Sequence, residues 1–103
     1  MNMLQVSLKP GYRKALTKCY YFTKNYAVTK SLDEYDYTYG ITYIKYGVKV
    51  CSCSNKNIAI ALCRMLNKKF PNPYIDRWQV KDFVVEFFIE SSVSNFHVRS
   101  YNC

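Results

Sequence analysis

The sequence predicts a small α+β domain, in which two helices cover one face of an antiparallel sheet of four to five strands. Three observations predict it: segments in which apolar residues alternate, two segments with helical spacing, and a length of 103 residues that suits one hydrophobic core. The order of the segments favours the βαββαβ order of ferredoxin-like sandwiches, with one extra strand. No linker or repeat divides the chain, so we take residues 1–103 as a single domain.

The first two expected elements are a strand and a basic helix. The strand covers residues 3–8, where "MLQVSL" alternates before "KPG" ends it. A helix is expected over residues 12–26, because the spacing separates apolar from basic residues at about 100° per residue. Its apolar side holds Tyr12, Leu16, Cys19, Tyr20, Thr23 and Ala27. Its basic side holds Arg13, Lys14, Thr17, Lys18, Tyr21, Lys24 and Asn25. The tyrosine pair and Thr23 also fit a strand, so the part beyond Tyr20 stays open between the two.

A hairpin and a second helix are expected in the middle of the chain. The Tyr-, Thr-, Ile- and Val-rich stretch predicts strands at 36–45 and 48–53, with the turn at Gly47. The helix begins after a capping Ser54 or Asn55 and ends before the prolines at 71 and 73. Its apolar residues repeat at helical spacing, and they are Ile58, Leu62, Met65 and Leu66. Lys68 and Lys69 fall in its last turn, where cations complement the helix dipole.

Two strands are expected at the C-terminal end. Residues 82–90, "DFVVEFFIE", alternate, which predicts a core side of Phe83, Val85, Phe87 and Ile89. The other side then carries Val84, Glu86, Phe88 and Glu90. "SSVSN" provides a turn, and residues 96–101 return as an edge strand.

The positive charge is unevenly distributed along the chain. The formal net charge is +8, yet residues 1–32 hold six Lys or Arg and no acid, and residues 37–75 hold six more, again without an acid. Residues 76–103 hold three cations and four acids, a net charge of −1. Such asymmetry predicts a basic face and an anionic partner, although a solvated basic surface is the simpler alternative.

The candidate binding residues are those that we expect on the basic surface. They are Arg13, Lys14, Lys18, Tyr21, Lys24, Lys45, Lys49, Arg64 and Lys68. Lysine and arginine bind phosphates through charge, and tyrosine adds stacking on unpaired bases. The tyrosines at 35, 37, 39 and 43 form another stripe, and on a sheet face that no helix covers they would stack on bases. A register shift of one residue would turn them into the core, and we expect them there.

No catalytic residue, metal site or cofactor is expected. His97 is the one histidine, and nothing around Cys51, Cys53 or Cys63 resembles a cysteine-protease signature. Cys51 and Cys53 would share a strand face, but a zinc site would need two further ligands from Cys19, Cys63, His97 or Cys103. The acids at 82, 86 and 90 are interpreted as a solvated face rather than a metal set. The glycine loops that bind phosphate are missing from a chain with three glycines.

The remaining features concern location and partners. The five cysteines, the start without a signal-like pattern and the lack of a long apolar run predict an intracellular, cytoplasmic protein with reduced thiols and no membrane association. The leading hypothesis is a non-enzymatic protein that binds DNA or RNA through its basic helix. The alternative is an inhibitor or regulator of the phage or viral type, which binds an acidic or nucleic-acid-binding host protein, for example by occupying its nucleic-acid groove. A homodimer is left open.

Overall fold

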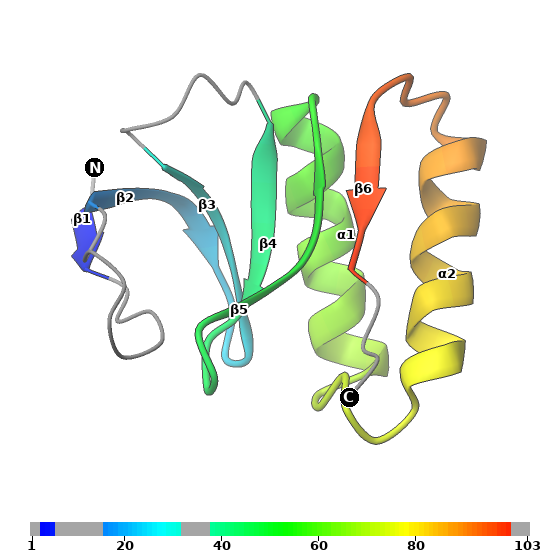
Figure 1. The fold of residues 1–103 in the computed structure, drawn as a ribbon, viewed down its shortest axis with the longest axis horizontal. Coiled ribbons are helices and arrows are strands. Elements are labelled where there is room, and N and C mark those ends of the chain that lie inside the picture. Colours follow the sequence, from blue (N-terminus) through cyan, green and yellow to red (C-terminus); the bar gives the residue numbers. More distant parts are fainter. Residues whose placement is uncertain (1–2, 6–15, 32–37, 100–103) are drawn as a thin grey trace.

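Six strands and two helices make up the part of the chain that the computed structural model describes, residues 3–5, 16–31 and 38–99. Figure 1 shows their arrangement. The elements are β1 (Met3–Gln5), β2 (Leu16–Phe22), β3 (Tyr26–Ser31), β4 (Tyr39–Tyr43), β5 (Val48–Cys53), α1 (Lys56–Lys69), α2 (Arg77–Glu90) and β6 (Phe96–Val98).

All six strands join one antiparallel sheet in the order in which they occur along the chain, β1-β2-β3-β4-β5-β6. The α+β class with an antiparallel sheet and two helices is confirmed. The ferredoxin-like βαββαβ order is not confirmed, because both helices of the described residues lie between β5 and β6. Four to five strands were expected, and the sheet has six when the three-residue edge strands β1 and β6 are counted.

The described part of the segment expected as a basic helix, residues 16–26, lies in a β-hairpin. The N–H of Thr23 donates to the carbonyl of Tyr26 at 2.7 Å, and its Oγ1 accepts from the N–H of Tyr26 at 3.1 Å, which closes the turn between β2 and β3. Aromatic and β-branched side chains are abundant in both strands and favour the pleated conformation. The register shifts between Cys19 and Tyr21, so Tyr20 occupies a bulge. Residues 12–15 of the expected helix lie outside the described residues.

The expected hairpin and second helix are confirmed. β4 pairs with β5, and Gly47 in their turn has a φ of 63°, a conformation that glycine adopts without strain. Asn55 is the N-cap of α1, and its Oδ1 accepts from the N–H of Ile58 at 3.1 Å. Lys68 and Lys69 occupy the last turn of α1, and Ala59, Leu62, Cys63 and Leu66 form its buried side.

The segment expected as a strand over residues 82–90 belongs to helix α2. Its buried residues Val80, Val84 and Phe88 recur every four positions, which is the spacing of one helix face. The helix ends in a Schellman arrangement: Ser92 has a φ of 58°, its N–H donates to the carbonyl of Ile89 at 3.1 Å, and the N–H of Val93 donates to Phe88 at 3.2 Å. Of the side chains expected inside, Ile89 is exposed, whereas Phe83, Val85 and Phe87 are half-buried.

Helix α1 covers one face of the sheet, and α2 packs against α1 and the edge strand β6. Cys53 lies opposite Tyr39 in β4 and Phe96 in β6, so these three residues share a face. The ring of Phe88 in α2 lies 5.0 Å from that of Phe96, and α1 contacts β3, β4 and β5 on this side. The opposite face carries Thr29, Thr42 and Ser52 together with the exposed Phe22 and Lys49, and the hydroxyls of Thr29 and Thr42 are 3.1 Å apart there.

Candidate nucleic-acid interface

One end of the sheet brings together three segments that are distant in the sequence: the β2–β3 turn, the β4–β5 turn and the last turn of α1 (Figure 1). Asn25 connects them. Its backbone N–H and its Nδ2 donate to Oδ1 of Asn67 in α1, at 3.0 and 2.9 Å. Its carbonyl accepts from the N–H of Ile44 in the β4–β5 turn at 2.9 Å. These hydrogen bonds hold the three segments against one another.

Three exposed lysines lie next to these hydrogen-bonded residues. Lys24 precedes Asn25, Lys45 follows Ile44, and Lys68 follows Asn67. Each lysine is therefore one residue away from a member of the same hydrogen-bonded group. All three were expected in the binding site, and the fold gathers them at one end although 44 positions separate the first from the last.

Tyr46 adds an exposed aromatic ring beside Lys45. The ring is 54% exposed, yet it contacts Tyr43 and Tyr74 edge-on, at centroid distances of 5.4 and 5.3 Å. Nζ of Lys45 lies 5.7 Å from its centroid, within cation–π range. Since two neighbouring rings hold Tyr46 in place, it offers a surface for stacking at little cost in side-chain entropy. We call Lys24, Lys45, Lys68 and Tyr46 the three-lysine end.

The charge around the three-lysine end is positive over most of its extent. No Asp or Glu occurs in the described segments 16–31 and 38–75, so every acid of the described residues belongs to residues 76–90. Asp76, the N-cap residue of α2, is the first of them. Arg64 is exposed one helical turn before Lys68, about 6 Å along the axis of α1, and extends the row of cations.

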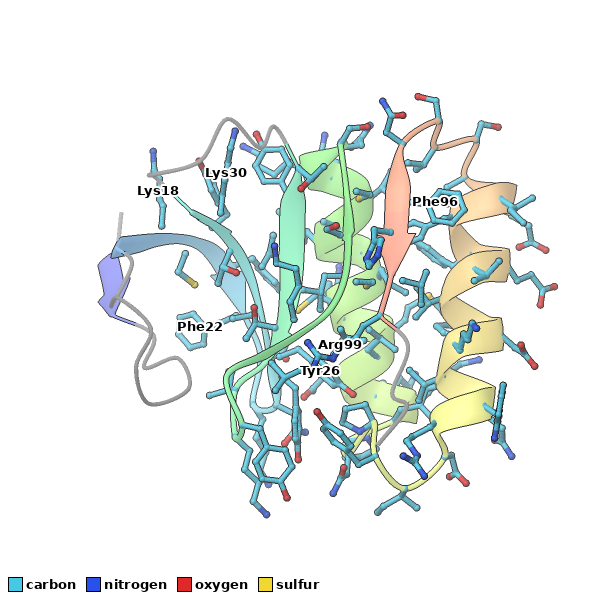
Figure 2. The ribbon with its side chains drawn as sticks, viewed as in Figure 1. Lys18, Phe22, Tyr26, Lys30, Phe96 and Arg99 are labelled. Carbon is cyan, nitrogen blue, oxygen red and sulfur yellow. The ribbon has the colours of Figure 1, made fainter. Side chains whose placement is uncertain are left out.

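Three other expected residues lie elsewhere. Lys18 is near the opposite end of the sheet, at the top of Figure 2, whereas Tyr26 marks the end with the turns. Tyr21 is half-buried and packs against the core, so it does not join an exposed basic side as expected. Lys49 lies on the face away from the helices, and a Cβ on Gly40 would lie 2.9 Å from its Cε. Its side chain therefore runs along the sheet from the row of Thr42 toward that of Gly40, away from the turns.

Other expected residues fall outside the description or in the core. Arg13 and Lys14 lie outside the described residues, as do Tyr35 and Tyr37. Tyr43 is buried and Tyr39 is half-buried against the core, which confirms the expected position of these two tyrosines.

The end of the sheet that holds Lys18 also carries a group of lysines and tyrosines. Nζ of Lys18 and Nζ of Lys56 lie 5.2 and 5.7 Å from the ring centroid of Tyr20. Nζ of Lys30 lies 5.2 Å from the ring centroid of Tyr39. The rings of Tyr20 and Tyr39 meet edge-on, with their centroids 5.2 Å apart. These ammonium groups lie over partly buried rings, so we place the candidate site at the three-lysine end.

Sequence reasoning missed three residues of the site. Tyr46 had a usable signal, because it immediately precedes the predicted turn glycine and turns are exposed. Asn25 and Asn67 had none, since a hydrogen bond between residues 42 positions apart leaves no local pattern.

The described thiols form part of the core and not of this site. Cys19, Cys51, Cys53 and Cys63 are free and buried. Burial raises the pKa of Cys63 to about 12, against a weaker lowering by its hydrogen bond to Thr23. Burial also raises the pKa of Cys51 well above its usual range, and the nearby thiols of Cys53 and Cys63 add to this. Thiols held neutral are poor nucleophiles and poor metal ligands.

The described residues hold neither a cluster of metal ligands nor a helix that could span a membrane. In this part of the chain, no three His, Cys, Asp or Glu side chains are placed to hold a metal ion. Neither α1 nor α2 has the length and apolar character needed to cross a membrane. Comparisons with protein-family models, curated proteins and solved structures return no match.

Proposed function

We propose that this protein is a non-enzymatic nucleic-acid-binding protein that holds a strand at the three-lysine end. One observation carries the proposal: Lys24, Lys45 and Lys68 come from three separate segments, and hydrogen bonds to Asn25 hold those segments together. The proposal replaces the basic helix of the sequence hypothesis with a surface built from two turns and a helix end.

Each part of this surface has a physical role in binding. The lysines neutralise backbone phosphates and release counterions, which gives affinity with little dependence on base sequence. Tyr46 stacks on an unpaired base, and such a contact contributes about 1–3 kcal/mol. We therefore expect single strands of RNA or DNA to bind more tightly than duplexes, whose bases are already stacked.

The first experiment compares two variants that lose the same charge. One is Lys24→Gln/Lys45→Gln/Lys68→Gln, and the control is Lys18→Gln/Lys30→Gln/Lys56→Gln, which alters the three lysines that lie over Tyr20 and Tyr39 at the opposite end of the sheet. Fluorescence anisotropy measures binding to a dye-labelled single strand of mixed sequence. Losing three phosphate contacts should weaken binding about a hundredfold at 0.1 M salt, whereas the control should bind nearly as well as wild type.

A second variant tests the role of Tyr46. Tyr46→Leu keeps an apolar side chain against Tyr43 and Tyr74 but removes the stacking ring. We expect at least about fivefold weaker binding of single strands and little change for a duplex. An equal effect on both forms of nucleic acid would contradict stacking by Tyr46.

Equal losses in the two triple variants would mean that net charge alone attracts the nucleic acid, and the proposed site would be wrong. Lack of measurable binding by the wild-type protein would refute the proposal outright. The alternative is an inhibitor that docks on an acidic host protein. A pull-down with the wild-type protein as bait would then test it, with the Lys24→Gln/Lys45→Gln/Lys68→Gln variant as the control bait.

A further inference from the structure

Helix α2 exposes large apolar side chains on the side that faces away from the core. Trp78 is 75% exposed and Ile89 is 63% exposed, and Ile75 just before the helix is 75% exposed. Val85 lies between them and is half-buried. Trp78, Val85 and Ile89 occupy positions i, i+7 and i+11, which places them along one stripe of the helix. Isolated exposed apolar residues are ordinary, but an aligned stripe marks an interaction surface.

A row of acids runs along one flank of this stripe. Asp82, Glu86 and Glu90 are exposed and recur every four residues, so they form a row that begins beside the stripe at Asp82 and turns away from it by about 40° per step toward Glu90. They are three of the four acids among the described residues, in a protein whose formal net charge is +8. The outer side of α2 therefore carries an exposed apolar stripe with acids on one flank, and on the other flank Nζ of Lys81 lies 6.0 Å from the ring centroid of Trp78.

We propose that this surface docks a basic amphipathic helix of another protein. Such a helix would lay its apolar side along the stripe and place Lys or Arg side chains against the acidic row. The charge selects this occupant. An antiparallel two-fold pairing of α2 with a second copy would set each acidic row against its counterpart, and an anionic membrane surface would be repelled by the same row.

The dimensions suit a helix of ordinary length. The stripe from Trp78 to Ile89 spans eleven residues, about 16 Å along the helix axis, which matches three turns of a partner. A contact of three helical turns is short for a permanent complex and suits a reversible one. The docking surface does not depend on the nucleic-acid proposal, because it uses none of the residues of the three-lysine end.

The chain contains one tryptophan, so the fluorescence of Trp78 reports on this surface directly. The probe is a synthetic peptide of about 18 residues, five helical turns, with leucines on one side and flanking lysines. Its control replaces those lysines with glutamates. On titration into the full-length protein, the lysine peptide should shift the Trp78 emission to shorter wavelength and saturate. The glutamate peptide should bind at least about tenfold more weakly.

Variants then assign the contacts by anisotropy of a dye-labelled lysine peptide. Trp78→Ala should weaken binding at least about tenfold, and Asp82→Asn/Glu86→Gln/Glu90→Gln should do the same and remove most of the salt dependence. Ile89→Ser tests the other end of the stripe independently, and it should also weaken binding of the lysine peptide. The Lys24→Gln/Lys45→Gln/Lys68→Gln variant should keep peptide binding although it loses the oligonucleotide.

Several results would overturn the proposal. Equal binding of the two peptides, unchanged binding by the Trp78→Ala variant, or lack of binding by the wild type would each refute it. A blue shift that grows with protein concentration, together with a dimer in sedimentation, would assign the surface to a second copy. A larger shift with phosphatidylcholine vesicles than with the peptide would assign it to a membrane.

Discussion

Tyr26 is the largest fully buried side chain of the described residues, and it connects the sheet to the end of α1. Its hydroxyl donates to the carbonyl of Phe70, the C-cap residue of the helix. A carbonyl at a helix end has no partner within the helix, so the tyrosine satisfies a group that burial would otherwise leave unpaired. The same contact positions the last turn of α1, which carries Lys68.

Removing this hydroxyl should destabilise the fold. Tyr26→Phe keeps the ring but leaves the Phe70 carbonyl without this donor, and we expect the free energy of unfolding to fall by about 1–3 kcal/mol. Urea denaturation followed by circular dichroism measures it. Tyr46→Phe is the matched control and should be nearly silent, because Tyr46 is 54% exposed. Equal effects of the two substitutions would contradict the buried hydrogen bond.

The thiol of Cys63 predicts how stability depends on pH. Its pKa is about 12 in the folded protein, against an ordinary value of 9.0, because burial disfavours the thiolate. Between these values the unfolded chain has lost a proton that the folded protein retains. The contribution of Cys63 to stability is therefore complete below about pH 9 and is lost progressively as the pH rises toward 12.

Cys63→Ala tests this dependence. The variant should lose less stability than wild type between about pH 9 and pH 11, whatever constant offset the lost packing introduces. Denaturant unfolding at several pH values gives the two slopes. Parallel curves would show that Cys63 titrates at an ordinary pKa in the folded protein.

At the scale of elements, local pattern predicts β4, β5 and α1 but misassigns the segments on either side. The sequence of β2 shows helical spacing because a bulge at Tyr20 interrupts its alternation, so Tyr20 and Tyr21 both pack against the core. A bulge inserts one residue into a strand and removes the period of two that identifies it. The aromatic and β-branched composition was the better guide to this hairpin.

Helix α2 was mistaken for a strand for a different reason. Its core side and its outer stripe are both apolar, with Val84 and Phe88 on one and Val85 and Ile89 on the other. Over residues 82–90 these two sets produce an alternation by chance, and the single stripe that identifies a surface helix disappears. The exposed stripe that hides the helical pattern in the sequence is the same stripe that we propose as a docking surface.

Two neighbouring valines distinguish the helix from the strand. The helix buries Val84 completely and leaves Val85 half-exposed, whereas an alternating strand would bury Val85 beside Phe83 and Phe87. Val84→Ala should lower the free energy of unfolding by about 2 kcal/mol and Val85→Ala by less than about 1 kcal/mol. Chemical denaturation of both variants measures the difference. The reverse ranking would restore the strand and refute α2.

The lysines of the candidate site were predicted from the sequence, whereas Tyr46, the two asparagines and the arrangement were not. Lys24, Lys45 and Lys68 were all expected to bind an anion because of their charge and exposure. Their meeting at one end depends on the register of the sheet and on the hydrogen bond between Asn25 and Asn67, which are 42 positions apart. Long-range contacts of this kind have no counterpart in local periodicity, so the basic surface was assigned to a helix instead.

At the scale of the whole molecule, the described acids all lie in one region, which also carries the cations Arg77 and Lys81. The cations of the three-lysine end lie where the chain turns between strands and where α1 ends, whereas all described acids belong to α2 or its N-cap. If both proposals hold, the protein binds an anionic strand and a basic helix on different surfaces. The two binding reactions should then be additive, because they share no residue.

The measurement that tests the central claim most directly is the salt dependence of single-strand binding. The logarithm of the association constant is determined at several salt concentrations for wild type, for Lys24→Gln/Lys45→Gln/Lys68→Gln and for the control Lys18→Gln/Lys30→Gln/Lys56→Gln. If the three lysines contact phosphates together, the first variant should lose about two units of slope, at roughly 0.7 unit per contact, and the control should keep the wild-type slope. A wild-type slope in the first variant, or the same loss in the control, would contradict a binding site at the three-lysine end.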